Sequence, residues 1–173
     1  MPPVWMTLLS AIFPALAIVA ALKDATSFTI PNWISLTLIA AFAPVALLCG
    51  VALHDLGLAL GVGLIALLAG MVMFALGWIG GGDAKLLAAS ALWIGWPAVL
   101  PFVLITALCG GALALGLLGL RSIWLRPLAV RGPAWVGRLA TPDAAAPYGV
   151  AICAGALATF PDGVVSRAIH LLG

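Results

Sequence analysis

Charged side chains are scarce in this sequence, and glutamate is absent from it. Of 173 residues only 7% are charged, the acidic ones being five aspartates, whereas 65% are hydrophobic. The mean hydropathy is +1.30. A water-soluble domain needs far more polar surface than this, so the chain is expected to lie in a membrane, with lipid as its main surroundings. The few arginines form no basic patch, and no nucleic-acid partner is expected.

The sequence also lacks paired cysteines. Cys49, Cys109 and Cys153 stand alone inside apolar segments, and none forms a CxxC motif. This pattern predicts neither a zinc site nor a redox centre, and we expect buried structural thiols, no metal and no cofactor.

Long apolar runs are abundant and predict an all-α, polytopic membrane helical bundle. Each run of about 20 apolar residues is long enough to cross a bilayer about 30 Å thick. Residues 86–120 would make a single helix far too long, so we divide this run at Pro97, which breaks helices. The result is one membrane-embedded domain, residues 1–173, with about six transmembrane helices, at residues 4–22, 32–53, 56–79, 86–95, 98–120 and 147–160.

The basic residues predict the orientation of these helices. With six spans, one side of the membrane holds all of them but Arg167: Lys23, Lys85, Arg121, Arg126, Arg131 and Arg138. Basic residues in short loops favour the cytoplasm. The polar, Arg-containing loop at residues 121–146 is therefore predicted to be cytoplasmic, and both termini are predicted to lie outside.

Two of the five aspartates fall on this cytoplasmic side at helix ends. Asp24 follows the first predicted span, and Asp83 lies in the stretch GWIGGGDAKLLAA, residues 77–89. Placing an ionisable side chain near the hydrocarbon boundary costs free energy, so such a residue is expected to have a functional role. The other aspartates, Asp55, Asp143 and Asp162, read as solvated loop residues.

Two interpretations of this pair remain open on spacing alone. Asp24 can pair with the neighbouring Lys23, and Asp83 can cap the next helix. Alternatively, two carboxyl groups brought together share a proton and can hydrolyse a peptide bond, one accepting a proton from water and the other polarising the carbonyl. Lys85 can tune the pKa of Asp83 or extend its amine to lipid headgroups.

The three glycines before Asp83 favour the catalytic interpretation. Gly80, Gly81 and Gly82 allow positive φ angles and a close approach of another backbone, and a helix C-cap needs only one glycine. A substrate held in extended form against this backbone would place its carbonyl beside Asp83.

Two motifs carry a family resemblance. GGGDAKL resembles the GxGD signature of intramembrane aspartyl proteases, with Gly80, Gly82 and Asp83 at its fixed positions. KDATSFTIPNWI resembles the first motif of the prepilin peptidases, in which an aspartate is followed by an IPN, here with Asp24, Pro31 and Asn32. PYGVAICAG, from residue 147, is similar to the closing helix of that family, so the resemblance covers nearly the whole chain.

This resemblance implies a membrane aspartyl endopeptidase with Asp24 and Asp83 as its catalytic pair. Its substrates would be precursors of type IV pilin-like proteins, cut at the cytoplasmic face between a short basic leader and a hydrophobic helix. Gly80, Gly81, Gly82, Lys85, Pro31 and Asn32 would support the loop or bind substrate. The implied location is the inner membrane, with lipid and the pilus assembly machinery as implied partners.

The chain departs from the larger family members, which carry paired CxxC motifs and also methylate the new N-terminus. Peptidase activity alone is therefore expected. The small size resembles the form associated with Flp/Tad-type pili, although an archaeal preflagellin-type peptidase is similarly small. The alternative of another class is a non-enzymatic membrane scaffold or small transporter subunit that uses the acids as proton or ion ligands.

Overall fold

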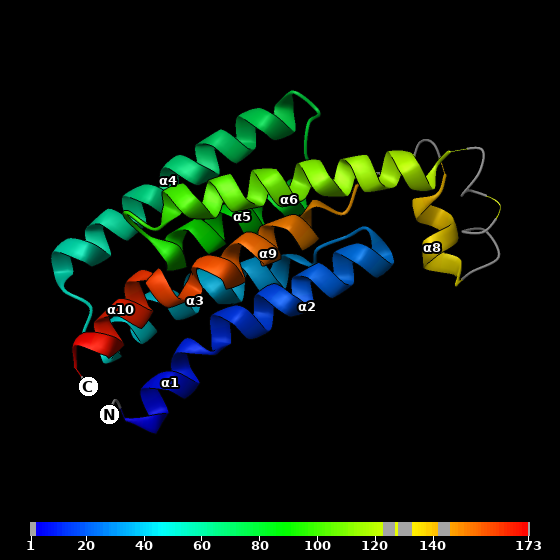
Figure 1. Cartoon of the computed structure of the whole chain (residues 1–173). Helices are drawn as coiled ribbons and strands as arrows, with labels where there is room; N and C mark the ends of the chain where they lie inside the picture. Colours follow the sequence, from blue (N-terminus) through cyan, green and yellow to red (C-terminus); the bar gives the residue numbers. More distant parts are fainter. Residues whose placement is uncertain (1–2, 123–126, 128–132, 142–145, 173) are drawn as a thin grey trace.

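The computed structural model describes residues 3–122, 127, 133–141 and 146–172, and every regular element within them is helical (Figure 1). The all-α prediction is confirmed for this part of the chain. Arg126, Arg131 and Asp143 lie outside the described residues. Of the predicted loop at residues 121–146, the structure describes chiefly the short helix α8, Ala134–Leu139.

Within the described residues, four helical segments are long and apolar enough to cross a membrane, which agrees with a multi-pass membrane protein. Two are single helices, α4 (Leu53–Ala75) and α6 (Val99–Leu120). The other two are built from shorter helices that follow one another closely. These are α1 (Val4–Ser10) with α2 (Ile12–Ser27), and α9 (Tyr148–Thr159) with the 3₁₀ turn η1 (Phe160–Asp162) and α10 (Val164–Leu171). The count of six spans and the outward termini stay predictions.

Two further helices, α3 and α5, are shorter than these spans. Helix α3 runs over Asn32–Leu48 and is apolar, and α5 runs over Gly81–Ile94. Helix α5 has 14 residues, and all but a few of its side chains are buried, since it packs against α4, α3 and α9. A helix surrounded by other helices does not need to match the bilayer thickness, and this explains how α5 can be so short.

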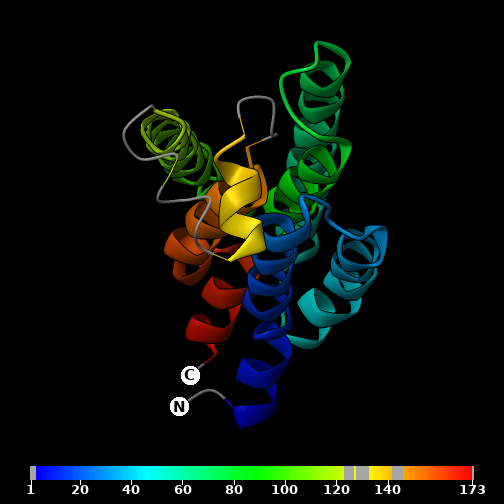
Figure 2. The ribbon, with the colours of Figure 1, turned by 90° about the vertical axis from the view of Figure 1, so that its right-hand side faces the viewer.

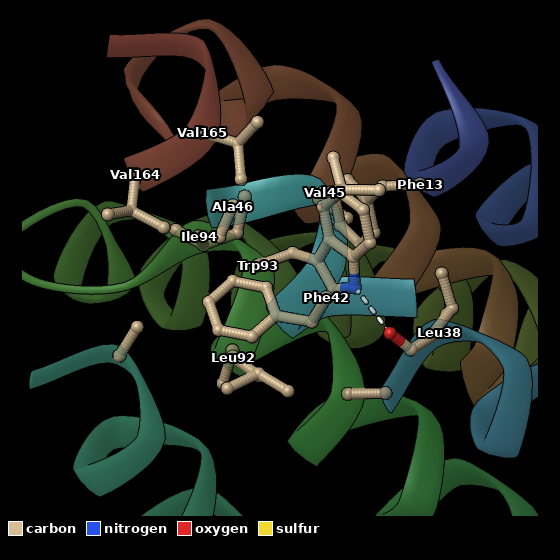
Figure 3. Packing of buried hydrophobic residues seen from close by; sticks show 14 of the residues in the cluster. Phe13, Leu38, Phe42, Val45, Ala46, Leu92, Trp93, Ile94, Val164 and Val165 are labelled. Carbon is tan, nitrogen blue, oxygen red and sulfur yellow. Dashed lines mark hydrogen bonds between the residues drawn. The ribbon is translucent and has the colours of Figure 1, made fainter. Parts of the chain in front are cut away.

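Trp93, near the C-terminal end of α5, organises the core beside this helix (Figure 3). Its ring stacks on Phe13 of α2 with 5.5 Å between centroids and meets Phe42 of α3 edge-on at 5.7 Å. The indole N–H donates a hydrogen bond of 2.9 Å to the carbonyl oxygen of Leu38. The buried polar group is thus satisfied, and α2, α3 and α5 are held in one arrangement.

Several helix boundaries differ from those predicted, and α3 and α4 end at Leu48 and Ala75, before the predicted residues 53 and 79. Helix α2 continues past Asp24 to Ser27, and the tail beyond Pro161 forms α10 as a continuation of the last span. Helix α5 begins at Gly81, so two of the three glycines and Asp83 lie in its first turn instead of in a loop. Hydropathy could not locate this start because the glycines and Asp83 carry no apolar signal.

The bundle has two distinct ends (Figures 1 and 2). The two chain termini lie near each other at one end, and α8 lies at the other, where it contacts α2. The C-terminal end of α2 and the N-terminal ends of α5 and α9 meet at the α8 end. His54 and His170 belong to the first turn of α4 and the last turn of α10, at the end that holds the termini.

Candidate active site

Asp24 lies in the last turn of α2 and is 5% exposed. Its Oδ2 accepts a hydrogen bond of 2.7 Å from the main-chain N–H of Gly149, at the start of α9. Among the described residues no ion pair joins Asp24 to Lys23. The pairing with Lys23 considered for this residue is therefore absent, and the carboxyl group points into the bundle instead.

Asp83 is the third residue of α5 and is 8% exposed. Its Oδ2 accepts a hydrogen bond of 3.2 Å from the main-chain N–H of Gly80, the residue before the helix. Its Oδ1 is buried and has no hydrogen-bond partner. Asp83 thus supports the helix start, but one carboxyl oxygen is left over, which capping does not explain.

The structure brings Asp24 and Asp83 to one cavity of about 210 Å³, although they are far apart in the sequence. The remaining lining comes from the segment after α2 and from the glycine turn: Phe28, Thr29, Ile30, Gly80, Gly81 and Gly82. Both acids therefore border a space that a water molecule and part of a peptide can enter.

The pKa of Asp83 reflects this environment. Asp83 lies outside the four candidate spans. Burial of the carboxyl group, followed by the negative charge of the nearby Asp24, raises its pKa from 3.8 to about 6. Hydrogen bonds from the N–H groups of Gly80 and Gly149 oppose this rise. A carboxyl group with such a pKa gains and loses its proton near neutral pH, as general acid–base catalysis requires.

Of the two reasons expected for the glycines, close approach applies and positive φ does not. None of them has a positive φ; the nearest glycine that does is Gly77, with φ 73°. A Cβ on Gly80 would lie 2.9 Å from Oδ2 of Asp83, and one on Gly82 would lie 3.1 Å from Cβ of Ile30. Close packing beside the acid, and not left-handed backbone, therefore explains the absence of side chains at Gly80 and Gly82.

The remaining candidates, Pro31, Asn32 and Lys85, do not line this cavity. Asn32 and Lys85 line another cavity, of about 480 Å³. Pro31 precedes α3, and Asn32 is the first residue of that helix. The Lys85 amine donates a hydrogen bond of 2.9 Å to Oδ1 of Asn32. This bond connects the IPN motif to the helix that carries Asp83.

Sequence reasoning missed the roles of three residues at this end of the bundle. Gly149 was visible only as part of the PYG stretch, and its bond to Asp24 depends on the docking of α9. Phe28, which lines the cavity, has the left-handed φ of 54°. Arg138 of α8 lies beside it, with its guanidinium 5.7 Å from the Phe28 ring centroid and 2.7 Å from the carbonyl oxygen of Thr26. No sequence signal distinguishes Phe28, and Arg138 stood out only as one of the basic residues on the predicted cytoplasmic side.

Comparisons with known proteins bear on the same residues. The model of the type IV leader peptidase family matches residues 11–115, a stretch that holds both motifs and both acids. No curated protein and no solved structure matches the chain. The match covers more than half of the chain and ends before Gly149. The resemblance inferred from the two motifs is confirmed, and the chain belongs to the type IV leader peptidase family.

Proposed function

We propose that this chain is an aspartic-type membrane endopeptidase that removes the leader peptide of type IV pilin-like precursors, with Asp24 and Asp83 as its catalytic pair. Membership of the family supports a leader-peptidase-like protease. The observation that carries the proposal is the cavity that Asp24 of α2 and Asp83 of α5 both border, beside the glycine turn.

The mechanism uses water and no covalent intermediate. One carboxylate takes a proton from a water molecule, whose oxygen attacks the scissile carbonyl carbon. The other carboxyl group, still protonated, donates to the carbonyl oxygen as negative charge develops there. The pKa of about 6 for Asp83 supports a pair in which one member is protonated near neutral pH.

The cavities around Asp83 support a substrate with one polar and one apolar side. Asp83 borders the cavity shared with Asp24 and also a second cavity of about 180 Å³ between α4, α5, α6 and α9. The second cavity is almost entirely apolar, with Met73, Val103 and Ile152 among its lining residues. A precursor cleaved where a polar leader joins a hydrophobic segment would present matching chemistry to the two cavities.

We further propose that cleavage occurs at the cytoplasmic face of the inner membrane and that the substrate is a Flp-type pilin. The end of the bundle that carries the two acids also carries Lys23, Lys85, Arg121 and Arg138, at or near the ends of α2, α5, α6 and α8. Basic residues near helix ends favour the cytoplasmic side. An archaeal preflagellin-type precursor is the alternative substrate.

A scaffold or small transporter subunit is the alternative function. Transporters bind their substrates and coupling ions near the bilayer midplane, on interrupted helices. Here Asp24 lies in the last turn of α2 and Asp83 in the first turn of α5. Acids at helix ends beside a surface cavity fit hydrolysis of a peptide that approaches from the aqueous side better than they fit ion transport.

Co-expression with a candidate pilin precursor tests the proposal. The mass of the pilin, measured in the presence and absence of this chain, should decrease by the mass of its leader. A preflagellin-type precursor expressed in parallel distinguishes the two substrate classes. An unchanged mass for every precursor would contradict the peptidase function, and cleavage abolished by a chelator and restored by a divalent metal would contradict the two-aspartate mechanism.

A further inference from the structure

We propose that the main-chain N–H of Gly149 assigns the roles within the acid pair: it keeps Asp24 ionised, as the base that activates water, and leaves the proton on Asp83. Gly149 is thus a positioning residue, which acts through Asp24. The inference rests on the proposed function for its catalytic meaning, but the ionisation it describes can be measured without any substrate.

The N-terminus of α9 provides the donor. Gly149 is the second residue of this helix, and its N–H has no partner within the helix because it belongs to the first turn. Pro147, at the N-cap, has no side chain that could accept from it. The carboxylate of Asp24 accepts this N–H at 2.7 Å and so caps α9 from another helix. The positive end of the α9 dipole adds to the stabilisation of a negative charge there.

The packing around Gly149 fixes this contact. A Cβ at this position would lie 2.8 Å from Oδ2 of Asp24, 3.0 Å from its Cβ and 3.0 Å from Cδ1 of Ile30. Only glycine leaves space for the carboxylate to approach the main chain so closely. The backbone of α9 and the end of α2 are therefore packed directly on each other at the acid.

Asp83 is buried to a similar extent as Asp24, but its main-chain donor is farther away. The N–H of Gly149 faces both acids, but the short hydrogen bond is to Asp24. Asp83 has only the longer bond of 3.2 Å from Gly80, and its Oδ1 is buried without a partner. Burying a carboxylate oxygen without a hydrogen-bond partner costs free energy. A protonated carboxyl group, in contrast, can donate a hydrogen bond from its O–H to the carbonyl oxygen of a bound substrate.

No basic side chain among the described residues supplies this asymmetry. Within the described ranges no ion pair joins either acid to a lysine or an arginine. Two cations at this end of the bundle bond to other acceptors: the amine of Lys85 bonds to Asn32, and the guanidinium of Arg138 bonds to the carbonyl of Thr26. The difference between the two acids thus comes from main-chain donors.

The assignment gives a balanced reaction. The water oxygen bonds to the carbonyl carbon, one water proton passes to Asp24, and the Asp83 proton passes to the carbonyl oxygen, which gives a neutral tetrahedral diol. As the C–N bond breaks, Asp24 returns its proton to the leaving nitrogen and Asp83 recovers one from a hydroxyl of the diol. One water is consumed, and a new carboxyl terminus and a new amino terminus form.

Carboxyl ¹³C NMR of the purified full chain in nanodiscs tests the assignment directly. Because the chain has five aspartates and no glutamate, selective labelling of aspartate gives at most five side-chain signals, which Asp→Asn variants assign. As the pH is lowered from about 8, we expect the Asp83 signal to shift first, near the pKa of about 6, while Asp24 remains ionised. If Asp24 takes up the first proton, or both signals move together, the proposal is overturned.

The variant Gly149→Ala tests the part played by the N–H contact, with Gly111→Ala as the matched control. A Cβ at Gly111 of α6 meets nothing within 4 Å, so that variant should behave as the parent chain. In Gly149→Ala the pH values at which Asp83 and Asp24 titrate should lie closer together. The kcat should fall roughly tenfold or more with little change in KM, as expected for loss of a charge-assisted hydrogen bond.

The possible outcomes separate the role of Gly149 from the proposed function. A folded Gly149→Ala variant in which Asp24 and Asp83 titrate as in the parent chain would show that Gly149 does not determine which acid is ionised. If that variant does not fold, the titration of the unaltered chain decides alone. Failure of the parent chain to cleave any precursor, with the titration order as expected, would contradict the proposed function but not the ionisation of the pair.

Discussion

The amine of Lys85 donates a hydrogen bond of 2.9 Å to Oδ1 of Asn32, across 53 positions of sequence. The bond joins α5, which carries Asp83, to Asn32, which is both the last residue of the IPN motif and the first residue of α3. The two motifs that identify the family are therefore connected physically as well as by their order in the chain.

This contact yields a first test. The variant Lys85→Met keeps the apolar stem and removes the donor, so α5 should move relative to α3 and precursor cleavage should fall several-fold. The global effect on stability should be small because exposed polar contacts contribute little. The matched control is Lys23→Met, at the same end of the bundle, which should keep full activity. Equal activity of the two variants in a cleavage time course would contradict a role for the Lys85 contact.

The pKa of Asp83 makes a prediction about stability. Since its pKa rises from 3.8 to about 6 on folding, the folded chain binds this proton more tightly than the unfolded chain. Stability therefore decreases as the pH rises between these two values, by roughly 3 kcal/mol in total. Asp83→Asn should unfold at a higher temperature than the parent chain at pH 8, and the difference should disappear near pH 4.

Tryptophan fluorescence during heating can follow this comparison, since the chain has seven tryptophans. The control is Asp55→Asn, whose side chain is 53% exposed and lies in the first turn of α4. If Asp83→Asn is no more stable than the parent chain at pH 8, the ionised form of Asp83 does not destabilise the folded chain, and the prediction is wrong.

The glycine turn gives a ranked series. A Cβ would lie 2.9 Å from Asp83 at Gly80 and 3.1 Å from Ile30 at Gly82, but at Gly81 the nearest atom is 3.4 Å away, on the Phe74 ring. Gly80→Ala and Gly82→Ala should therefore lose most cleavage activity, and Gly81→Ala should keep most of it. Initial rates on one precursor measure the series, and a Gly81→Ala variant as inactive as the other two would show that the packing argument is wrong.

Arg138 is expected to shape the wall of the cavity. It binds the carbonyl of Thr26 and lies over the ring of Phe28, which lines the cavity with a left-handed backbone. Arg138→Ala should release Phe28 and reduce cleavage several-fold, mainly through KM, because the wall that receives the substrate becomes mobile. Lysine should not restore the activity, since it cannot both bind the carbonyl and stack on the ring.

Arg167→Ala is the control for that variant. Arg167 also donates to a main-chain carbonyl, that of Trp96, at 2.6 Å, but it belongs to α10 at the other end of the bundle. Its loss should affect stability without affecting cleavage. A cleavage defect of similar size in both arginine variants would indicate a general loss of folded protein.

The helical class, the long apolar spans and the location of both acids at one end of the bundle could be predicted from the sequence. Hydropathy and helix-breaking residues determine those features locally, and the motifs around Asp24 and Asp83 have fixed spacing. It was not sufficient for the start of α5, for the strained backbone of Phe28, or for the bond from Gly149 to Asp24. These depend on which helices pack together, and that information is not present in any single segment.

The most direct test of the catalytic pair is the cleavage of one precursor by Asp24→Asn, Asp83→Asn and Asp55→Asn, with the mass of the product as readout. Asparagine keeps the shape of each side chain but can neither take up the proton from water nor donate one as an acid. We expect the first two variants to leave the precursor at full length and Asp55→Asn, at the opposite end of α4 from the glycine turn, to process it normally. Normal processing by either Asp24→Asn or Asp83→Asn would contradict the account.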